Sequence, residues 1–570
     1  MRNRLTIGIA GAGGDGVVVL GSLLQRLAAS QGYFSQMPRY YGPQIRGGAS
    51  GVALSLDTAR ASLPADTPDI MVCFNWERYA ELEQELPLRA DSIVFYDSIA
   101  PKGSVSLPEK SFPVAFSETS EKLTGTASAK NIVALGLLDR VLGLSDGTLK
   151  GVVPQDEALA LLEKNGPALS AGRQLLPEIP FPGLKLYPSR DPSVKVVLHG
   201  NGAVAQGAMQ AGCRAFFGYP ITPASEIMQE MQEHLARGKG VFLQAEDEIA
   251  SIGLALGASL TGAKSMTATT GPGLDLMTEM MGLASSAEIP VVIVDVQRCG
   301  PSTGIPSKSE QADLNHVVCG GHGDAPRVVV APYNMEGCYR LVIESFNISE
   351  YYQSPVILLS DQWLGQTTVA AGSDFLNTDY AIAGRKRPGR ENREPYRRYE
   401  ITEDFISPMA SVGDEGLVYQ ATGLSHDEEG RPSFDFATHQ HMHQKRWQKL
   451  MPLRHRDELV KVLGNEESGR GIVAFGSTAQ FVLETVEDLG LQDRLRICIP
   501  ELIHPLPDRV ATFAGSLEKL LVMDMSYSGQ LHRYLRSQID LPSDTQVYAR
   551  AGGLAFSRKE LSRPITELAQ

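Results

Sequence analysis

The sequence has 570 residues, enough for about four domains at roughly 150 residues each. Its 43% hydrophobic and 21% charged residues are ordinary for globular domains and exclude a disordered chain, a collagen and a coiled coil. The 52 Lys and Arg residues against 66 Asp and Glu give a formal net charge of −14. Because an acidic chain repels phosphate backbones and anionic lipid, we expect neither nucleic acid nor a membrane as a partner.

Cysteine usage argues against a metal centre in this chain. The six cysteines lie far apart, with no Cys-x-x-Cys pair and no Cys/His spacing suited to a metal cage. Scattered unpaired cysteines suit a reducing compartment. Glycines between Gly8 and Gly16 break the apolar run that follows the N-terminus, which argues against a secretory signal. We therefore expect a cytoplasmic protein without an iron–sulfur cluster or structural zinc of its own. The cysteines are Cys73, Cys213, Cys299, Cys319, Cys338 and Cys498.

Short β-branched runs alternate with helix-period segments along most of the chain. This alternation predicts an α/β fold with parallel sheets and crossover helices, in several domains. A proline-rich stretch at 176–192 indicates a linker between two such blocks. The predicted strands are 5–10, 70–74 and 92–96 in the first block, 196–198, 241–244, 291–296, 328–330 and 356–360 in the second, and 472–475, 496–499 and 520–523 in the third. The predicted helices are 17–29, 76–86, 227–235, 249–260 and 478–489.

Two segments of the first block are candidates for ligand contacts. Gly11 to Gly16 fits G-x-G-x-x-G after a strand, but Asp15 would face a pyrophosphate and no ribose-binding acid follows. Close packing of strand and helix is therefore the stronger interpretation of this turn. The segment 38–50 is polar and glycine-rich, and we predict a loop that contacts an anionic or nucleotide-bearing ligand or another subunit.

Four loops of the second block follow predicted strands and are rich in Gly, Thr and Pro. Two prolines fix the turn of 219–226, so that Thr222 lies at the carboxyl end of a strand, unless Thr222 or Ser225 merely caps a helix. The acidic run 246–248 precedes an Ala-rich helix, where it either serves the helix dipole or has one acid buried for catalysis. Loops at one edge of a parallel sheet form a ligand crevice, and Arg298 is its natural carboxylate clamp.

Two further stretches leave their roles open. Residues 384–400 hold seven basic and three acidic side chains, which predicts a solvated connector, or else a clamp for a phosphate or an acidic partner. His439, His441 and His443 form a His-x-His-x-His run. Only Asp435 stands close among the acids, so we predict no metal here, and the role of the run stays open.

Four motifs together resemble the α subunit of 2-oxoacid:ferredoxin oxidoreductases, and in particular the fused γ–α subunit of the 2-oxoglutarate type. They are Tyr-Pro-Ile-Thr-Pro at 219–223, Glu-Asp-Glu-Ile-Ala at 246–250, Thr-Gly-Pro-Gly at 270–273 and Gln-Arg-Cys-Gly-Pro-Ser-Thr-Gly at 297–304. The resemblance covers nearly the whole chain. It implies a γ domain over 1–190, a thiamine-pyrophosphate pyrimidine-binding domain over 191–375, a connector over 376–460 and a transketolase C-terminal-like domain over 461–570.

The resemblance also implies chemistry shared between two chains. A partner β subunit would supply the diphosphate and magnesium site and a [4Fe–4S] cluster, whereas this chain supplies the pyrimidine side of thiamine pyrophosphate. The complex would convert a 2-oxo acid and coenzyme A into an acyl-CoA and carbon dioxide, with ferredoxin as the electron acceptor. A heterotetramer of two α and two β chains is the expected assembly.

Individual positions take their expected roles from the resemblance. Glu248 would bond the aminopyrimidine ring, and Thr222 and Arg298 would orient the 2-oxo acid, with Tyr219, Pro220, Ile221, Thr270 and Gly271 at the cofactor. Ser307 stands where relatives often have Thr, and Lys308 after it favours a substrate with a second carboxylate, although a surface lysine is equally compatible. We expect a coenzyme A or subunit contact at Arg39, Tyr41 and Arg46.

The predicted function is therefore that of a 2-oxoglutarate synthase subunit. Two alternatives remain at this stage: a relative specific for pyruvate or an aryl pyruvate, and a noncatalytic scaffold subunit with a vestigial cleft. The presence of Glu248, Thr222 and Arg298 argues against the scaffold.

Overall fold

A computed structural model of the chain describes residues 2–42, 47–98, 106–144, 165–175, 184–189, 191, 195–377, 379–389 and 396–570. The chain divides into two compact units. Unit 1 comprises 1–199, 366–377 and 557–559, and unit 2 comprises the remaining residues. Among the described residues, no helix is both long and apolar enough to span a bilayer.

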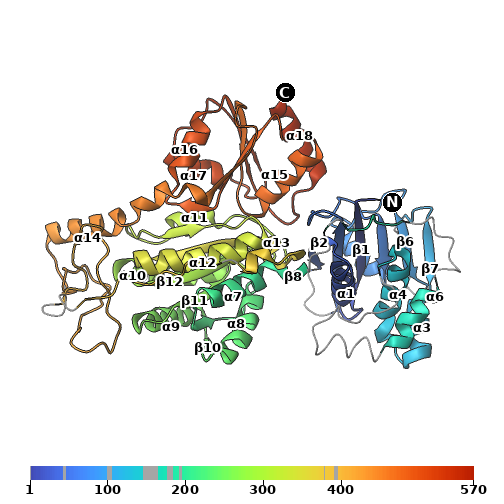
Figure 1. Cartoon of the computed structure of the whole chain (residues 1–570), viewed down its shortest axis with the longest axis horizontal. Coiled ribbons are helices and arrows are strands. Elements are labelled where there is room, and N and C mark those ends of the chain that lie inside the picture. Colours follow the sequence, from blue (N-terminus) through green and yellow to red (C-terminus); the bar gives the residue numbers. More distant parts are fainter. Residues whose placement is uncertain are drawn as a thin grey trace. The chain divides into compact units, whose positions relative to one another are not determined.

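Unit 1 is built on a mixed sheet in the order β7-β6-β5-β1-β4-β2-β15-β8, with β3 paired to β4 (Figure 1). Strands β1, β5, β6 and β7 are mutually parallel, whereas β4, β2, β15 and β8 join by antiparallel pairs. The α/β fold class is confirmed, and the parallel arrangement holds for one half of this sheet. The strands are Arg4–Ala12 (β1), Phe34–Met37 (β2), Arg39–Tyr41 (β3), Ala49–Asp57 (β4), Ile70–Cys73 (β5), Ile93–Asp97 (β6), Ser111–Val114 (β7), Lys195–His199 (β8) and Thr368–Gly372 (β15).

Helices α1 and α4 supply most of the apolar side chains that cover this sheet. Leu20, Leu24 and Leu27 of α1 are buried in one cluster with Ile132 and Leu135 of α4, as expected for helices with one apolar stripe. The helices are Val17–Ser30 (α1), Trp76–Tyr79 (α2), Phe116–Thr124 (α3), Lys130–Leu142 (α4) and Gly166–Gln174 (α6).

Two local predictions for unit 1 were wrong. The predicted helix 76–86 is only the single turn α2 followed by a short 3-10 turn, Ala80–Leu82. The apolar spacing that suggested a helix comes from three side chains that are buried in the core: Trp76, Tyr79 and Leu82. Within the predicted loop 38–50, Arg39–Tyr41 forms β3, because its backbone pairs with β4. Most of the predicted linker 176–192 lies outside the described residues.

The first sheet of unit 2 has the order β10-β9-β11-β12-β14-β13-β19. All its neighbours are parallel except β19, which runs antiparallel to β13. The central strands are buried on both faces, which explains their continuous apolar runs. The strands are Ala215–Gly218 (β9), Val241–Gln244 (β10), Ser265–Thr269 (β11), Val291–Gln297 (β12), Val328–Val330 (β13), Pro355–Asp361 (β14) and Leu502–His504 (β19).

Helices connect these strands and pack on the sheet. Helices α7 and α12 pack together, as do α9 and α10. Predicted helices 227–235 and 249–260 are confirmed as the cores of α8 and α9. The helices are Gly200–Gln210 (α7), Ser225–Arg237 (α8), Glu248–Leu260 (α9), Gly271–Ser286 (α10), Leu314–Cys319 (α11), Met335–Tyr352 (α12) and Gln362–Gln366 (α13).

The C-terminal part of unit 2 carries a second sheet in the order β16-β18-β17-β20-β21, with α16 and α17 on one side and α15 on the other (Figure 1). Strand β16 is antiparallel to β18, and the other pairs are parallel. The strands are Val460–Gly464 (β16), Arg470–Val473 (β17), Arg496–Pro500 (β18), Lys519–Asp524 (β20) and Asp544–Ala549 (β21). The helices are Gly476–Asp488 (α15), Asp508–Gly515 (α16), Gln530–Gln538 (α17) and Arg558–Ala569 (α18).

Between the two sheets of unit 2 the chain is largely irregular up to helix α14, Phe436–Gln448. A buried ion cluster fixes α14: Nζ of Lys445 lies 2.5 Å and Nζ of Lys449 2.8 Å from carboxylate oxygens of Glu288. Arg385 is likewise buried against Glu350. The predicted solvated connector 384–400 is therefore wrong at Arg385 and Arg398, which are both buried and hold the segment to the core.

Candidate functional site

Four loops rich in predicted site residues follow four neighbouring strands of the first unit 2 sheet. Strands β10, β9, β11 and β12 are adjacent and parallel, so their carboxyl ends meet at one edge. Chain crossovers bring the loops after them, and the N-termini of α8, α9 and α10, to this edge. Ligands of parallel sheets bind outside such an edge. The four loops of the predicted crevice therefore lie at one edge of the sheet.

Thr222 and Arg298 are joined by a direct hydrogen bond. Nη1 of Arg298 donates to the main-chain oxygen of Thr222 over 2.6 Å. Arg298 is 7% exposed, its Nε has no partner among the described residues, and burial lowers the pKa of its guanidinium. Helix α8 starts after Ala224 without a side-chain cap, so neither Thr222 nor Ser225 serves as its N-cap. Nε of Arg298 and the side chain of Thr222 are therefore available for a ligand at the edge of the sheet.

The other residues of the Tyr-Pro-Ile-Thr-Pro motif lie at the surface of this edge. Tyr219, Pro220 and Thr222 are exposed, whereas Ile221 is half-buried. The peptide bond between Thr222 and Pro223 is cis. Asn201 of α7 anchors the turn, because its Nδ2 donates a hydrogen bond to the main-chain oxygen of Pro223 over 2.9 Å. The motif is thus an exposed turn that hydrogen bonds from Asn201 and Arg298 hold in place.

Glu248 is a buried acid at the first turn of α9. It is 5% exposed, and none of the described residues pairs with its carboxylate. The preceding Asp247 is the N-cap, because its Oδ1 accepts the N–H of Ala250 over 2.7 Å. Asp247 thus serves as the N-cap of α9, so Glu248 is not needed for that role.

The Thr-Gly-Pro-Gly loop packs directly against Glu248. A Cβ atom at Gly273 would lie 2.5 Å from Oε1 of Glu248, so only glycine fits there. Thr270 is the N-cap of α10, yet its buried Oγ1 has no hydrogen-bond partner among the described residues. A buried hydroxyl without a partner is costly unless a ligand completes it. These residues therefore fit a nitrogen heterocycle with one polar edge.

The loop after β12 turns back tightly before Ser307 and Lys308. Gly304 has a φ of +54° and lies against the oxygen of Cys299, so a side chain there would clash. The N–H of Cys299 donates to the oxygen of Lys308 over 3.0 Å. Ser307 and Lys308 are half-buried in the strand-end loop that begins with Arg298. The structure thus brings both residues into the same loop as Arg298.

Two acids of this region, the buried Asp295 and the half-buried Asp313, were missed in the sequence. Asp295 lies inside β12, fully buried, and both its carboxylate oxygens are without partners among the described residues. Asp313 precedes α11 and adjoins Gly271. Burial and then the charge of Asp313 raise the pKa of Asp295 well above its usual range. The detectable signal was an aspartate within the apolar run Val-Val-Ile-Val-Asp-Val.

The candidate residues of unit 1 lie apart from this edge in the sequence and are described separately. The Gly11–Gly16 turn closes on itself, because Oδ2 of Asp15 accepts the N–H of Ala12 over 2.7 Å and its Oδ1 pairs with Lys130 over 2.7 Å. Arg39 donates to Oγ1 of Thr368 over 3.1 Å. Tyr41 is half-buried at the end of β3, and Arg46 lies outside the described residues. The turn therefore fits close strand–helix packing.

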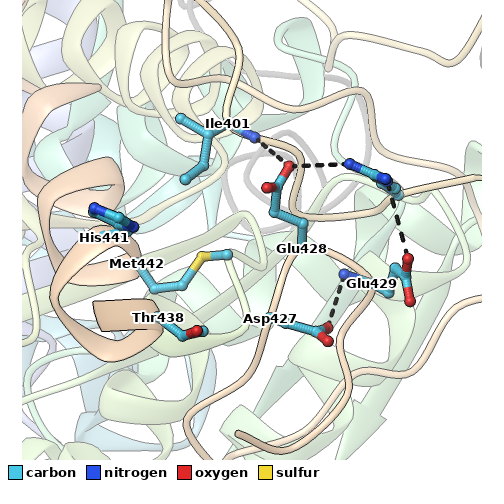
Figure 2. Close-up of a pocket in the computed structure, with 8 residues that line it drawn as sticks. Ile401, Asp427, Glu428, Glu429, Thr438, His441 and Met442 are labelled. Carbon is cyan, nitrogen blue, oxygen red and sulfur yellow. Dashed lines mark hydrogen bonds and ion pairs between the residues drawn. The ribbon is translucent and has the colours of Figure 1, made fainter. Parts of the chain in front are cut away.

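A cavity of about 230 Å³ lies away from all predicted site residues, between α14 and the irregular chain before it. Figure 2 shows its lining, including Thr438, His441 and Met442 of α14. Its acidic side chains are already engaged: Oε2 of Glu428 accepts the N–H of Ile401 over 3.2 Å, and Glu429 pairs with Arg431. These contacts account for the acids without a ligand.

The histidine run lies on α14. The rings of His439 and His443 are 4.5 Å apart, and Nδ1 of His439 lies 3.0 Å from Oγ of Ser425. Across the described ranges, no three His, Cys, Asp or Glu side chains are grouped so that they could hold a metal ion.

Comparisons with known proteins match the chain to two family models. Residues 206–445 match the model described as pyruvate flavodoxin/ferredoxin oxidoreductase, thiamine diP-bdg. Residues 6–175 match the model described as pyruvate ferredoxin/flavodoxin oxidoreductase. The first match contains Thr222, Glu248, Thr270 and Arg298, so a thiamine diphosphate-binding domain family covers the whole edge described above.

Curated relatives and a solved structure agree. The chain is 34% identical to the 2-oxoglutarate synthase subunit KorA of Methanocaldococcus jannaschii, over 65% of this chain and 98% of that protein. It is 36% identical to the 2-oxoacid:ferredoxin oxidoreductase 2 subunit alpha of Aeropyrum pernix, over 64% of this chain; the chain spans only 59% of that relative's length.

The structural similarity extends over the full chain. The 2-oxoglutarate:ferredoxin oxidoreductase from Magnetococcus marinus, solved with 2-oxoglutarate, coenzyme A and succinyl-CoA bound, matches with a TM-score of 0.90 and 33% identity, over 100% of both chains. The family models, the curated relatives and the fold thus indicate the same family. The chain belongs to the 2-oxoacid:ferredoxin oxidoreductase family and carries that family's thiamine diphosphate-binding domain.

Proposed function

We propose that this chain is the α subunit of a 2-oxoglutarate:ferredoxin oxidoreductase. The complete enzyme would interconvert 2-oxoglutarate and coenzyme A with succinyl-CoA and carbon dioxide, passing the released electron pair to ferredoxin. The observation that carries this proposal is the match over both full lengths to the Magnetococcus marinus enzyme, at 33% identity. The relatives named 2-oxoglutarate synthase subunit support the same substrate.

The division of labour within the chain is part of the proposal. Residues 1–190 would form the γ domain, 191–375 the pyrimidine-binding domain, 376–460 a connector and 461–570 the transketolase C-terminal-like domain. The family matches at 6–175 and 206–445 support the first two assignments.

Thiamine diphosphate, when bound, supplies the carbon nucleophile that a 2-oxo acid needs to lose carbon dioxide. Glu248 would hold a proton against the pyrimidine ring, because its buried carboxylate has no protein partner. Thr270 would offer its unpaired hydroxyl, and Gly271, Tyr219, Pro220 and Ile221 would line the same side.

Arg298 and Thr222 would orient the 2-oxo acid. Nη1 of Arg298 is engaged by the oxygen of Thr222, but its buried Nε is without a partner, and a substrate carboxylate would complete it. A hydrogen bond to a charged group of this kind contributes about 1.5–3 kcal/mol. Ser307 and Lys308 would contact the distal end of the substrate, where a lysine favours the second carboxylate of 2-oxoglutarate.

A partner β subunit would cover the edge that carries Glu248. Three large apolar side chains are exposed on the two helices that begin at this edge: Ile249 and Leu254 on α9, and Leu276 on α10. Exposed apolar surface of this kind marks a protein interface. The β subunit would bring the diphosphate and magnesium site and a [4Fe–4S] cluster, and two α and two β chains would form the complex in the cytoplasm.

Unit 1 would contribute residues that contact coenzyme A. Arg39, Tyr41 and Arg46 remain the candidates for a coenzyme A or subunit contact. Arg39 already bonds Thr368, so its role there would be shared between the fold and the ligand.

The test uses the complex purified without oxygen together with its natural partner. Viologen reduction is measured with 2-oxoglutarate or pyruvate, with and without coenzyme A. Coenzyme A-dependent reduction with 2-oxoglutarate is the expected result. Reduction with pyruvate or an aryl pyruvate instead would keep the reaction and overturn the substrate.

A scaffold role is tested with the same preparation. Replacing Glu248 with Gln should remove most turnover, because glutamine cannot exchange the proton, and should leave the complex assembled. Glu466→Gln, on the exposed surface of the C-terminal block, is the matched control. No turnover of any oxo acid by the wild-type complex, with its thiamine diphosphate and cluster shown to be present, would favour the noncatalytic scaffold.

A further inference from the structure

One short segment, residues 309–313, joins the candidate site to the second sheet of unit 2. The segment directly follows the loop that begins with Arg298 and ends with Lys308. Strands β17, β20 and β21 of the second sheet are adjacent and parallel, so their carboxyl ends meet at one edge. Residues that follow each of these three strands form hydrogen bonds with the segment.

Gln311 makes the contacts to the ends of β17 and β20. Its N–H donates to the main-chain oxygen of Met525, directly after β20, over 2.8 Å. Its Nε2 donates to the main-chain oxygen of Phe475 over 3.1 Å, and its Oε1 accepts the hydroxyl of Thr478 over 2.6 Å. The fully buried side chain of Gln311 therefore fixes the segment against these two strand ends.

Glu310 makes the contact to the end of β21 and also returns to the Arg298 loop. Its Oε1 accepts the N–H of Gly552, in the turn after β21, over 3.0 Å. Its Oε2 accepts the N–H of Gly300, two residues after Arg298, over 3.1 Å. Because Glu310 is buried, water competes little for these two hydrogen bonds. One carboxylate thus joins the second sheet to the loop of the candidate site.

The turn after β21 packs directly against Glu310. A Cβ atom at Gly552 would stand 2.5 Å from Cβ of Glu310 and would overlap the main-chain oxygen of Ser309, so only glycine fits there. The N–H of Gly553 donates to the same oxygen of Ser309 over 3.1 Å. The backbone on both sides of the Glu310 carboxylate is therefore held in place.

The segment also bonds to the residue that precedes Arg298. The N–H of Asp313 donates to Oε1 of Gln297, the last residue of β12, over 3.1 Å. Arg298 therefore lies between two anchored residues, because Gln297 is bonded to Asp313 and Gly300 is bonded to Glu310. The position of the Arg298 backbone depends on both contacts.

We propose that Glu310 is a positioning residue that ties the Arg298 loop to the second sheet of unit 2 and so holds Arg298 where it meets the carboxylate of a 2-oxo acid. The proposal rests on the proposed function. Glu310 acts through the backbone of Gly300, and its carboxylate is suited to this role because each of its oxygens accepts one N–H. A glutamine amide offers only one acceptor oxygen, and alanine offers none.

The first test measures viologen reduction with 2-oxoglutarate by the assembled complex carrying Glu310→Gln or Glu310→Ala. The KM for 2-oxoglutarate should rise roughly tenfold in Glu310→Ala and less in Glu310→Gln, with kcat little changed, because a poorly oriented Arg298 weakens substrate and transition state alike. The KM for coenzyme A should stay unchanged. A purely structural role of Glu310 would lower the amount of folded complex but not change the KM for 2-oxoglutarate.

The matched control is Glu428→Gln in the connector. Glu428 also accepts a main-chain N–H, that of Ile401, but it lies away from the candidate site. Glu428→Gln should therefore keep the wild-type KM for 2-oxoglutarate.

A double-mutant cycle tests whether Glu310 acts through Arg298. The effects of Glu310→Ala and Arg298→Ala on kcat/KM should not be additive, because Glu310 has no side chain left to position once Arg298 is truncated. Full additivity of the two effects would overturn the proposed route through Arg298.

The second test needs no turnover. In Glu310→Ala the N–H groups of Gly300 and Gly552 lose their acceptor, so peptides that contain them should exchange hydrogen for deuterium roughly tenfold faster than in the wild-type complex. Peptides from β12 and β20 should keep the wild-type rate, as should all four regions in Glu428→Gln. Mass spectrometry of the assembled complexes provides the measurement.

The outcomes separate the two proposals. An unchanged KM in both Glu310 variants, in a complex that turns over 2-oxoglutarate, would overturn the positioning role and leave the proposed function in place. Unchanged exchange at Gly300 in Glu310→Ala would overturn the tether itself. Absence of turnover in the loaded wild-type complex would overturn the proposed function and, with it, the role of Glu310 toward the substrate.

Discussion

Gly273 lies directly against the carboxylate of Glu248. A Cβ atom at position 273 would stand 2.5 Å from Oε1 of Glu248 and would also overlap Oγ1 of Thr269. The second glycine of the Thr-Gly-Pro-Gly motif is therefore a spacer that lets α10 approach the buried acid. The position of the acid depends on a residue that has no functional group.

Gly273→Ala should displace Glu248 and remove most activity. The neighbours are a buried carboxylate and a buried threonine, so relief requires movement of α10, at a cost of about 1–3 kcal/mol. Gly282→Ala on the same helix meets open space. It should be neutral or stabilise the full chain by up to about 1 kcal/mol. Viologen reduction and urea unfolding of both variants measure the difference; an active Gly273→Ala enzyme would contradict the spacer role.

Arg298→Lys should lower kcat/KM for the 2-oxo acid by roughly 10- to 150-fold, the equivalent of about 1.5–3 kcal/mol. A lysine carries the charge but cannot bond the oxygen of Thr222 and a substrate carboxylate with one planar fork. Arg494→Lys, at an exposed position, is the control. Steady-state kinetics of the assembled complex provide the measurement, and equal kcat/KM values in both variants would refute the clamp.

Leu254→Glu should weaken assembly with the β subunit. Leu254 is exposed on α9, so a charge there leaves the fold of the chain intact but disfavours burial in an interface. Leu489→Glu, similarly exposed at the end of α15, should assemble normally. Size-exclusion chromatography with light scattering of the co-purified subunits distinguishes the two, and a fully assembled Leu254→Glu complex would place the interface elsewhere.

Lys445→Met should destabilise the full chain by about 3–5 kcal/mol. The substitution leaves Glu288 fully buried with one cation fewer, and breaking a buried pair strands the remaining charge. Lys122→Met removes a pair with Glu118 of similar length, 2.6 Å, but both of its side chains are more than half exposed. That variant should unfold at nearly the same urea concentration as the wild type, because solvent screens an exposed pair. Urea unfolding compares them.

His504 should make the chain less stable in mild acid. Burial, and then the charge of Arg327, lower the pKa of His504 to about 4, so the folded chain binds fewer protons than the unfolded chain between about pH 4 and pH 6.5. Stability from the neutral imidazole is present above about pH 6.5 and is lost as the pH falls, by up to about 3 kcal/mol. His504→Gln should show less of this loss in unfolding scans at about pH 7 and pH 5; an unchanged scan would contradict it.

Much of the fold and of the candidate edge could be predicted from the sequence. Strands β10, β12 and β14 and helices α8 and α9 were predicted because their apolar periodicity is local. Arg298 was found because it follows an apolar strand in a polar loop, whereas Glu248 was singled out from the acidic run 246–248 by the resemblance to a known family. The hydrogen bond between Arg298 and Thr222 follows once parallel strands place both loops at one edge.

Other features depend on partners far away in the chain. Strand β15 lies in the sheet of unit 1, antiparallel to β2, although about 330 residues separate the two strands. The charge of the segment 384–400 alone predicts a solvated connector. Arg385 is nevertheless buried, because it pairs there with Glu350. A residue's partners in space, not its own chemistry, set whether its charge is buried.

From the amino-acid sequence alone, the fold class and the four site loops follow from local periodicity and strand-end composition, whereas the expected roles of Thr222, Glu248 and Arg298 follow from the resemblance of four motifs to a known family. Only the tertiary structure decided that Asp313 adjoins Gly271, that Gly273 makes room for Glu248 and that Glu288 pairs with two lysines of α14. Those contacts join segments that are distant in the chain, and their energies depend on burial and distance, which exist only once the strands have packed.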